Sequence, residues 1–260
     1  VAKLLGTSWD DYFALGRQFV AKTPKVAWFD SAGAVFQARL NQMANPYSSS
    51  STEEKVIPLD QNTAIKDAYT QTLKASVDDK LSAGLGQWSQ DWTNSFQKGT
   101  FATMLCPSWM LGVVQGNAAG VKGWDVANAF PGGGGNWGGS YLTVPLQGAH
   151  PEEAKALAAW LTAPEQQIKA FKAKGTFPSQ VKALSSDELR SLKNAFFNDA
   201  PVGQIFADRA AAVQVMPFKG PNYFAITTAI SDAINRVDVD KKETPDSSWA
   251  KAVEEVAALG

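Results

Sequence analysis

Apolar residues recur with helical periodicity along much of the chain. In residues 7–21 one helical face runs from Trp9 to Val20, and Thr7 or Ser8 can cap the helix. The same criteria predict further helices at residues 32–43, 61–77, 88–97, 221–236 and 247–259. Two more helices are predicted to begin at residues 109 and 151, and another to follow a capping box at Thr162–Glu165.

Short apolar runs lie between these helices. They predict strands at residues 25–29, 100–105, 124–130 and 140–145. Strands that alternate with helices of 10–15 residues are typical of an α/β architecture with a largely parallel sheet. We therefore expect an α/β fold, and the 260 residues suffice for one or two domains.

The charges nearly cancel, with 24 Lys and Arg against 25 Asp and Glu, and no long run of either sign occurs. This balance offers no electrostatic footprint for nucleic acid or an anionic membrane surface, so no nucleic-acid partner is expected. The single cysteine, Cys106, cannot form an internal disulfide. The chain lacks an initiator Met and a signal peptide, so we expect a processed or truncated amino terminus.

Motifs for catalysis and cofactors are weak. Gly133, Gly135 and Gly138 form a G-x-G-x-x-G pattern, but a strand-like run follows where a dinucleotide site needs a helix. The single histidine, His150, precedes a helix and is best explained as a capping or surface residue. We expect no cofactor, no metal and no catalytic residue. Carboxylate pairs for glycoside hydrolysis stay open, because they converge only in the fold.

Aromatic residues are abundant, with nine Trp, five Tyr and fourteen Phe. Flat rings stack on flat ligands, so aromatic residues in Gly- or Pro-flanked loops are candidate binding surfaces. Trp9, Trp160 and Trp249 lie on apolar helical faces and are expected in the core. The pattern leaves Trp28, Trp88, Trp92 and Trp124 undecided.

The segment Phe96–Trp109 resembles the F-x-x-G-x-x-A-M-…-G-x-W signature of carbohydrate-type solute-binding proteins of ABC importers. Pro107 and Ser108 stand where that signature often has glycine. The further matching segments are Trp9–Tyr12, Trp137–Ser140, Leu142–Pro145, His150–Leu161, Thr162–Gln166 and Gly175–Ser179.

This resemblance implies a two-lobed, type II periplasmic-binding-protein-like fold with lobes that are discontinuous in sequence. Residues 1–138 and 218–260 would form the larger, substrate-binding lobe. Residues 143–205 would be a remnant of the other lobe, whose amino-terminal part is expected to be missing or to lie on a separate chain. Residues 139–142 and 206–217 would cross between the lobes, and the smaller lobe is expected to expose a sheet edge or an apolar face.

The resemblance also implies a set of ligand-binding residues. Trp109 aligns with the family's stacking tryptophan, with the protein core as its alternative. Tyr223 and Phe224 match an aromatic pair at a helix start, and Trp137 lies between glycine runs. The remaining expected contacts are Asp30 and Gln37 as hydroxyl partners, and the neighbours Ser108, Gly138, Gly139 and Asn222.

The implied function is a non-enzymatic receptor for an oligosaccharide, with a cello-oligosaccharide as first choice and a malto-oligosaccharide as second. Its partners would be the permease subunits of the importer. Its place would be extracellular, periplasmic or lipid-anchored at the outer face of the cytoplasmic membrane. Two alternatives stay open: a glycoside hydrolase or lyase with an aromatic sugar cleft, and a solute-binding protein for a non-sugar ligand.

Overall fold

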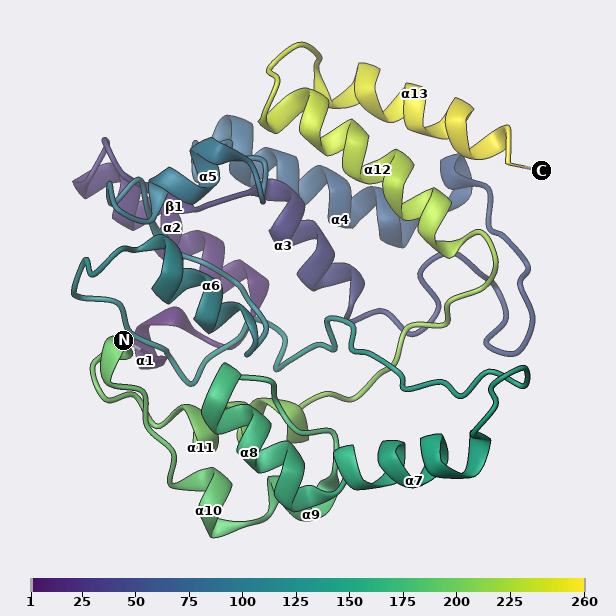
Figure 1. Cartoon of the computed structure of the whole chain (residues 1–260). Coiled ribbons are helices and arrows are strands. Elements are labelled where there is room, and N and C mark those ends of the chain that lie inside the picture. The colour runs from purple at the N-terminus through teal and green to yellow at the C-terminus, as the bar shows by residue number, and fades with distance from the viewer. Residues whose placement is uncertain (1, 260) are drawn as a thin grey trace. The chain divides into compact units, whose positions relative to one another are not determined.

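The computed structural model describes residues 2–259, and its packing divides the chain into two units (Figure 1). The first unit comprises Val1–Leu105, Ala129–Asn136 and Ala212–Gly260. The second unit comprises Cys106–Asn128 and Trp137–Ala211. Each unit is therefore assembled from segments that are separate in the sequence.

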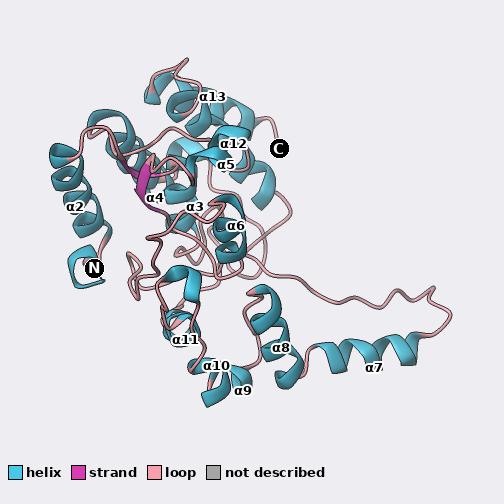
Figure 2. Cartoon of the chain, turned by 60° about the vertical axis from the view of Figure 1, so that its left-hand side comes forward, coloured by secondary structure: helices cyan, strands magenta, loops and turns pink. Residues whose placement is uncertain are grey.

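The first unit places helices around a small parallel sheet, whose strands are magenta in Figure 2. Ala27 lies opposite Phe101 and Phe29 opposite Thr103, and residues 81–85 run beside the first strand. The elements are α1 (Ala2–Leu5), α2 (Trp9–Lys22), β1 (Ala27–Phe29), α3 (Ala32–Leu40), η1 (Leu59–Gln61), α4 (Thr63–Leu73), η2 (Lys74–Asp78), α5 (Gln90–Ser95), β2 (Phe101–Thr103), α12 (Tyr223–Asp238) and α13 (Pro245–Ala257).

One hydrophobic core joins these elements. Helix α12 contributes Ile226, Ile230, Ile234 and Val237, which recur every three or four residues and so share one face. Helix α13 lies beside it in both views, and its Trp249 is buried as expected (Figures 1 and 2). The predicted helices of this unit are confirmed, each within a few residues at its ends.

Asp238, the last residue of α12, is a buried polar centre of this unit. Its Oδ2 accepts hydrogen bonds of 3.0 Å from the backbone N–H of Ala32 and from Ser82 Oγ, and its Oδ1 accepts one of 2.5 Å from Ser76 Oγ. The carboxylate lies at the start of α3, where its charge complements the helix dipole. Asp238 thereby holds the ends of three segments together beside the carboxyl end of β1.

The second unit contains helices and coil. Gly203 allows the close approach of two of its helices, since a Cβ there would lie 1.8 Å from the carbonyl oxygen of Leu189. Its elements are α6 (Met110–Asn117), α7 (Pro151–Leu161), α8 (Pro164–Lys174), α9 (Val181–Leu184), α10 (Asp187–Arg190), η3 (Ala195–Phe197) and α11 (Val202–Ala211). The sequence analysis missed the helices after α8, which are short apart from α11.

The second unit exposes apolar side chains. On α7, Trp160 is 56% exposed and Leu157 is equally open, and no residue of this helix is buried. In the preceding coil Tyr141 and Leu146 are almost fully exposed. The expectation of an exposed apolar face is confirmed, whereas the prediction that Trp160 belongs to the core is wrong: its helix is amphipathic, but the described part of the unit does not cover its apolar face.

Three other predictions about local structure are wrong. Residues 124–130 and 140–145 are coil, because no described strand lies beside them to accept their backbone hydrogen bonds. Thr162 does not cap α8: its Oγ1 donates to the carbonyl of Ala158, and Ala163 occupies the N-cap position.

The predicted lobe limits stay a prediction, and the packing units differ from them at residues 106–128 and at residues 137 and 138. Residues 106–128 group with the second unit, although they were expected in the larger lobe. The backbone packing gives the reason, since a Cβ at Gly112 of α6 would lie 3.9 Å from the carbonyl oxygen of Lys174 at the end of α8. Part of the predicted crossover at 206–217 is helical, because α11 continues to Ala211.

Candidate functional site

An aromatic pair begins helix α12 in the first unit. Tyr223 is buried and Phe224 is 67% exposed, and their rings meet at 85° with centroids 5.2 Å apart. A perpendicular arrangement is favourable for aromatic rings. The buried ring therefore supports an exposed one, and the predicted role of the pair in ligand binding stays a prediction.

Polar groups border this pair. Glu54 binds Asn222 through two hydrogen bonds, of 2.8 Å from the backbone N–H and 3.1 Å from Nδ2. The Lys219 ammonium lies 5.4 Å from the ring centroid of Tyr223 and 5.7 Å from that of Phe224. Asn222 is thus fixed at the start of α12, and a cation stands over both rings.

Tyr223 is also linked to α3 and to the loop before η1. Its ring lies 5.4 Å from that of Tyr47, and Thr227 Oγ1 donates to the Tyr47 hydroxyl at 3.2 Å. Burial raises the pKa of Tyr223, and a hydrogen bond with Gln37 opposes that shift. Gln37, which also donates to Asn41 Oδ1 at 2.9 Å, therefore lies beside Tyr223, and the ligand-binding roles predicted for both residues stay predictions.

Asp30 directly follows the last residue of β1 and is 1% exposed. Its Oδ2 accepts a hydrogen bond of 3.0 Å from Gln87 Nε2 and one of 2.9 Å from Trp92 Nε1. Burial raises the pKa of Asp30 to about 6, although these hydrogen bonds oppose the shift. The carboxyl group is engaged by protein donors, and its predicted role as a sugar hydroxyl partner stays a prediction.

Trp88 stands next to this network and was left undecided by the sequence. It is 59% exposed, and its ring centroid lies 5.1 Å from that of the fully buried Trp92. Its backbone has φ +73°, a conformation that costs a bulky residue on the order of 1–3 kcal/mol. The sequence analysis predicted a helix from residue 88, whereas α5 begins at Gln90 and Trp88 lies in the turn before it. The predicted helix therefore gave no indication of the exposure of Trp88 or of its positive φ.

The other predicted ligand residues belong to the second unit. Trp109 immediately precedes α6 and is 39% exposed, while the neighbouring Ser108 is buried. Trp137 is half-buried in coil. Gly138 and Gly139 follow with positive φ, and a Cβ at either would meet nothing within 4 Å. These positions belong to the second unit and Tyr223 and Phe224 to the first, so the prediction that all of them bind the same ligand stays a prediction.

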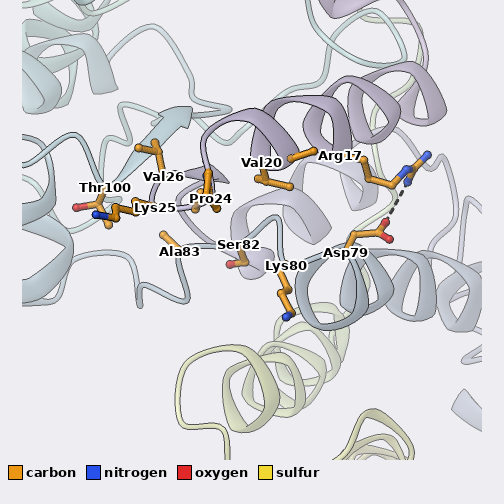
Figure 3. Close-up of a pocket in the computed structure, with 12 residues that line it drawn as sticks. Arg17, Val20, Pro24, Lys25, Val26, Asp79, Lys80, Ser82, Ala83 and Thr100 are labelled. Atoms are coloured by element: carbon orange, nitrogen blue, oxygen red, sulfur yellow. Dashed lines mark hydrogen bonds and ion pairs between the residues drawn. The ribbon is translucent and has the colours of Figure 1, made fainter.

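A surface pocket of about 570 Å³ opens elsewhere in the first unit (Figure 3). It lies at the amino ends of β1 and β2, where Ala27 and Thr100 line it, and an ion pair of 3.0 Å joins Arg17 to Asp79 on its wall. Ligands of open α/β sheets bind at the carboxyl ends of the strands. None of the predicted ligand residues lines this pocket.

Within residues 2–259, no three His, Cys, Asp or Glu side chains gather in a way that could hold a metal ion. No helix in that range combines the length and apolar character needed to cross a membrane.

Comparison with known proteins identifies a family and a fold. The family described as bacterial extracellular solute-binding protein matches residues 3–197. A crystal structure of an extracellular solute-binding protein of family 1 is 48% identical, with a TM-score of 0.90 over 99% of this chain and 64% of that one. The chain thus spans less than two thirds of that relative. Among the curated proteins compared, none matches.

More distant structures share the fold. The ABC transporter associated binding protein from B. animalis subsp. lactis Bl-04, solved with beta-1,6-galactobiose, is 19% identical with a TM-score of 0.73. A cyclo/maltodextrin-binding protein with maltotetraose is 18% identical with a TM-score of 0.64. Both alignments cover 99% of this chain and 66% of the other. The predicted fold class, an α/β binding-protein fold with parts discontinuous in sequence, is confirmed.

Proposed function

Because the chain belongs to the bacterial extracellular solute-binding proteins, we propose that it captures an oligosaccharide for an ABC importer. It acts as a receptor without catalysis, outside the cytoplasmic membrane, either in a periplasm or held at the membrane's outer face by a lipid anchor. Its partners are the permease subunits that accept the loaded receptor. Several aromatic positions suit several pyranose rings, which favours a di- to tetrasaccharide.

The aromatic pair of α12 is the observation that carries this proposal. A pyranose has an apolar C–H face and a rim of hydroxyl groups, so it needs a flat apolar surface bordered by hydrogen-bonding groups. Phe224 offers the exposed ring. Asn222 and Gln37 donate from their amide nitrogens to Glu54 and Asn41, and their amide oxygens are the proposed acceptors for sugar hydroxyls beside the pair. Trp109 and Trp137 of the second unit are the proposed further platforms, with Ser108, Gly138 and Gly139 as their neighbours.

The structural relatives guide the choice of sugar. Two of them were solved with beta-1,6-galactobiose and with maltotetraose, which differ in linkage and in length. The fold is thus compatible with more than one oligosaccharide, and a cello-oligosaccharide remains one candidate of the same class. The screen for the ligand therefore has to include all three linkages.

Receptor action is proposed in preference to glycoside hydrolysis. A general acid must come within hydrogen-bonding distance of the glycosidic oxygen, and a second carboxyl group must act across the bond. Asp30 has the raised pKa of such an acid, but its carboxyl group is buried and bonded to Gln87 and Trp92. These bonds favour a structural role for Asp30.

A thermal-shift screen of the full chain tests the proposal. β-1,6-Galactobiose, maltotetraose and cellotetraose are compared with spermidine and a tripeptide, and each mixture is analysed by chromatography after incubation. We expect at least one oligosaccharide to raise the melting temperature and to be recovered unchanged. Phe224→Ala should abolish most of the shift, while Trp160→Ala, at a similarly exposed aromatic residue, should preserve it. Stabilisation by spermidine or the peptide alone, or cleavage of the sugar, would contradict the proposal.

A further inference from the structure

Trp88 lies at the carboxyl edge of the sheet in the first unit. The N–H groups of Ala83 and Leu85 donate to the carbonyl oxygens of Phe29 and Asp30, so this segment leaves the sheet where β1 ends. A turn follows directly, closed by a hydrogen bond of 3.1 Å from the N–H of Ser89 to the carbonyl of Gly86. The carboxyl edge is where open α/β sheets bind ligands.

The backbone of Trp88 is strained within this turn. Trp88 occupies the third position with φ +73°, a conformation typical of a type II turn and normally taken by glycine. Its indole does not gain full burial in exchange, because 59% of the residue is exposed. Backbone strain at an exposed aromatic residue supports a functional role, since such strain persists mainly where a site requires it.

Buried groups hold the turn in place. Asp30 accepts hydrogen bonds from Gln87, the second residue of the turn, and from the indole of Trp92. Trp92 is fully buried, and its ring lies 5.1 Å from that of Trp88 at an angle of 49°. A rigid base thus supports an exposed ring, the arrangement that a stacking surface needs.

We infer that Trp88 is a stacking platform for a pyranose ring, a binding position additional to the predicted ligand residues. The exposed indole covers an apolar C–H face, and the amide oxygen of Gln87 accepts a hydrogen bond from a sugar hydroxyl. Asp30 and Trp92 are positioning residues that fix the ring without touching the ligand. This inference rests on the proposed function, because it assigns a further contact to the same class of ligand.

The substitution Trp88→Gly tests the platform while sparing the fold. Glycine adopts the positive φ without strain, so the melting temperature is expected to equal or exceed that of the wild type. The dissociation constant for the oligosaccharide that binds wild type most tightly among β-1,6-galactobiose, maltotetraose and cellotetraose is expected to rise at least tenfold, as for loss of an aromatic anchor. Trp88→Phe keeps an aromatic ring and is expected to restore most of the affinity. Trp160→Ala is the control at a similarly exposed tryptophan.

Tryptophan fluorescence supplies a second readout that a purely structural role would not change. Sugar is expected to alter the emission of the wild type and to protect it from acrylamide, and Trp88→Phe is expected to lose the part of that protection that Trp88 contributes. If Trp88→Gly lowers the melting temperature sharply, Trp88→Asn repeats the test with a residue that tolerates this backbone.

The possible outcomes distinguish failure of the Trp88 platform from failure of the proposed oligosaccharide binding. A wild type that binds sugar and a Trp88→Gly variant with an unchanged dissociation constant would overturn the platform role alone. A wild type that binds none of the three sugars would overturn the proposed function and the platform role with it.

Discussion

The indole Nε1 of Trp92 donates a hydrogen bond of 2.9 Å to Oδ2 of Asp30, and both residues are almost fully buried. The bond joins the carboxyl end of β1 to helix α5, which are 62 residues apart in the sequence. A buried carboxyl group in this setting combines a structural role with a titration that depends on folding.

Asp30 should make stability depend on pH in a defined direction. Burial raises its pKa in the folded chain from 3.8 to about 6, so the folded state binds the proton more tightly than the unfolded state does. Its contribution is therefore most favourable at low pH, declines as pH rises from about 4 to about 6, and then stays constant. The total change is about 3 kcal/mol for two pKa units.

Asp30→Asn isolates that contribution, because the amide does not titrate. The difference in unfolding free energy between wild type and variant, measured by urea denaturation from pH 4 to pH 8, is expected to shift against the wild type by about 2.5 kcal/mol, because the unfolded carboxyl group is already partly ionised at pH 4. A difference that stays constant over this range would show that Asp30 titrates normally.

Asp238→Ala should destabilise the first unit. The substitution leaves the N–H of Ala32 and the hydroxyls of Ser76 and Ser82 without their acceptor, and a hydrogen bond to a charged group contributes roughly 1.5–3 kcal/mol. We expect a loss of at least about 3 kcal/mol in urea denaturation. Asp232→Ala, at an exposed position of the same helix, is the control and should have little effect. Equal effects of the two variants would rule out the structural role of Asp238.

Gly203→Ala should destabilise the second unit. A Cβ would lie 1.8 Å from the carbonyl oxygen of Leu189, so helices α10 and α11 must separate, at a cost of about 1–3 kcal/mol. Gly116→Ala on α6 is the matched control, because its Cβ would meet nothing within 4 Å; it should be neutral or stabilising. Thermal melts of the two variants compare them directly, and an unchanged melting temperature for Gly203→Ala would contradict the packing described.

Trp109→Ala distinguishes a ligand platform from a core residue. Because Trp109 is 39% exposed, we expect a small change in melting temperature and a loss of affinity of about 30- to 1,000-fold, or on the order of 2–4 kcal/mol. Sugar titrations alongside a thermal melt measure both quantities. A sharply lower melting temperature with an unchanged dissociation constant would assign Trp109 to the core.

The sequence predicted correctly those structural features that depend only on residues close together in the sequence. The cap at Thr7 or Ser8 and the apolar face of α12 are local patterns; the structure has Ser8 as the N-cap of α2 and the apolar face as predicted. Residues 140–145 have a strand-like pattern but are coil, because a strand also needs a partner strand that the pattern does not reveal. Trp160 shows the same limit, since periodicity marks an apolar face without showing what covers it.

The candidate site was predictable to a similar degree. Tyr223 and Phe224 were predicted from the family resemblance as ligand contacts; the structure shows one ring buried and one exposed, and their binding role stays a prediction. Asp30 was recognised from its place after a strand, but its bonds to Gln87 and Trp92 come from distant segments. Trp88 was left undecided, because its exposure depends on a turn conformation that is unusual for tryptophan.

Isothermal titration calorimetry of the unmodified chain with β-1,6-galactobiose, maltotetraose and cellotetraose tests the central claim most directly. The account predicts saturable binding of at least one of these sugars at one site per chain, with a dissociation constant on the order of micromolar, or about −8 kcal/mol. Binding of a polyamine or a peptide with no heat from any oligosaccharide would contradict it.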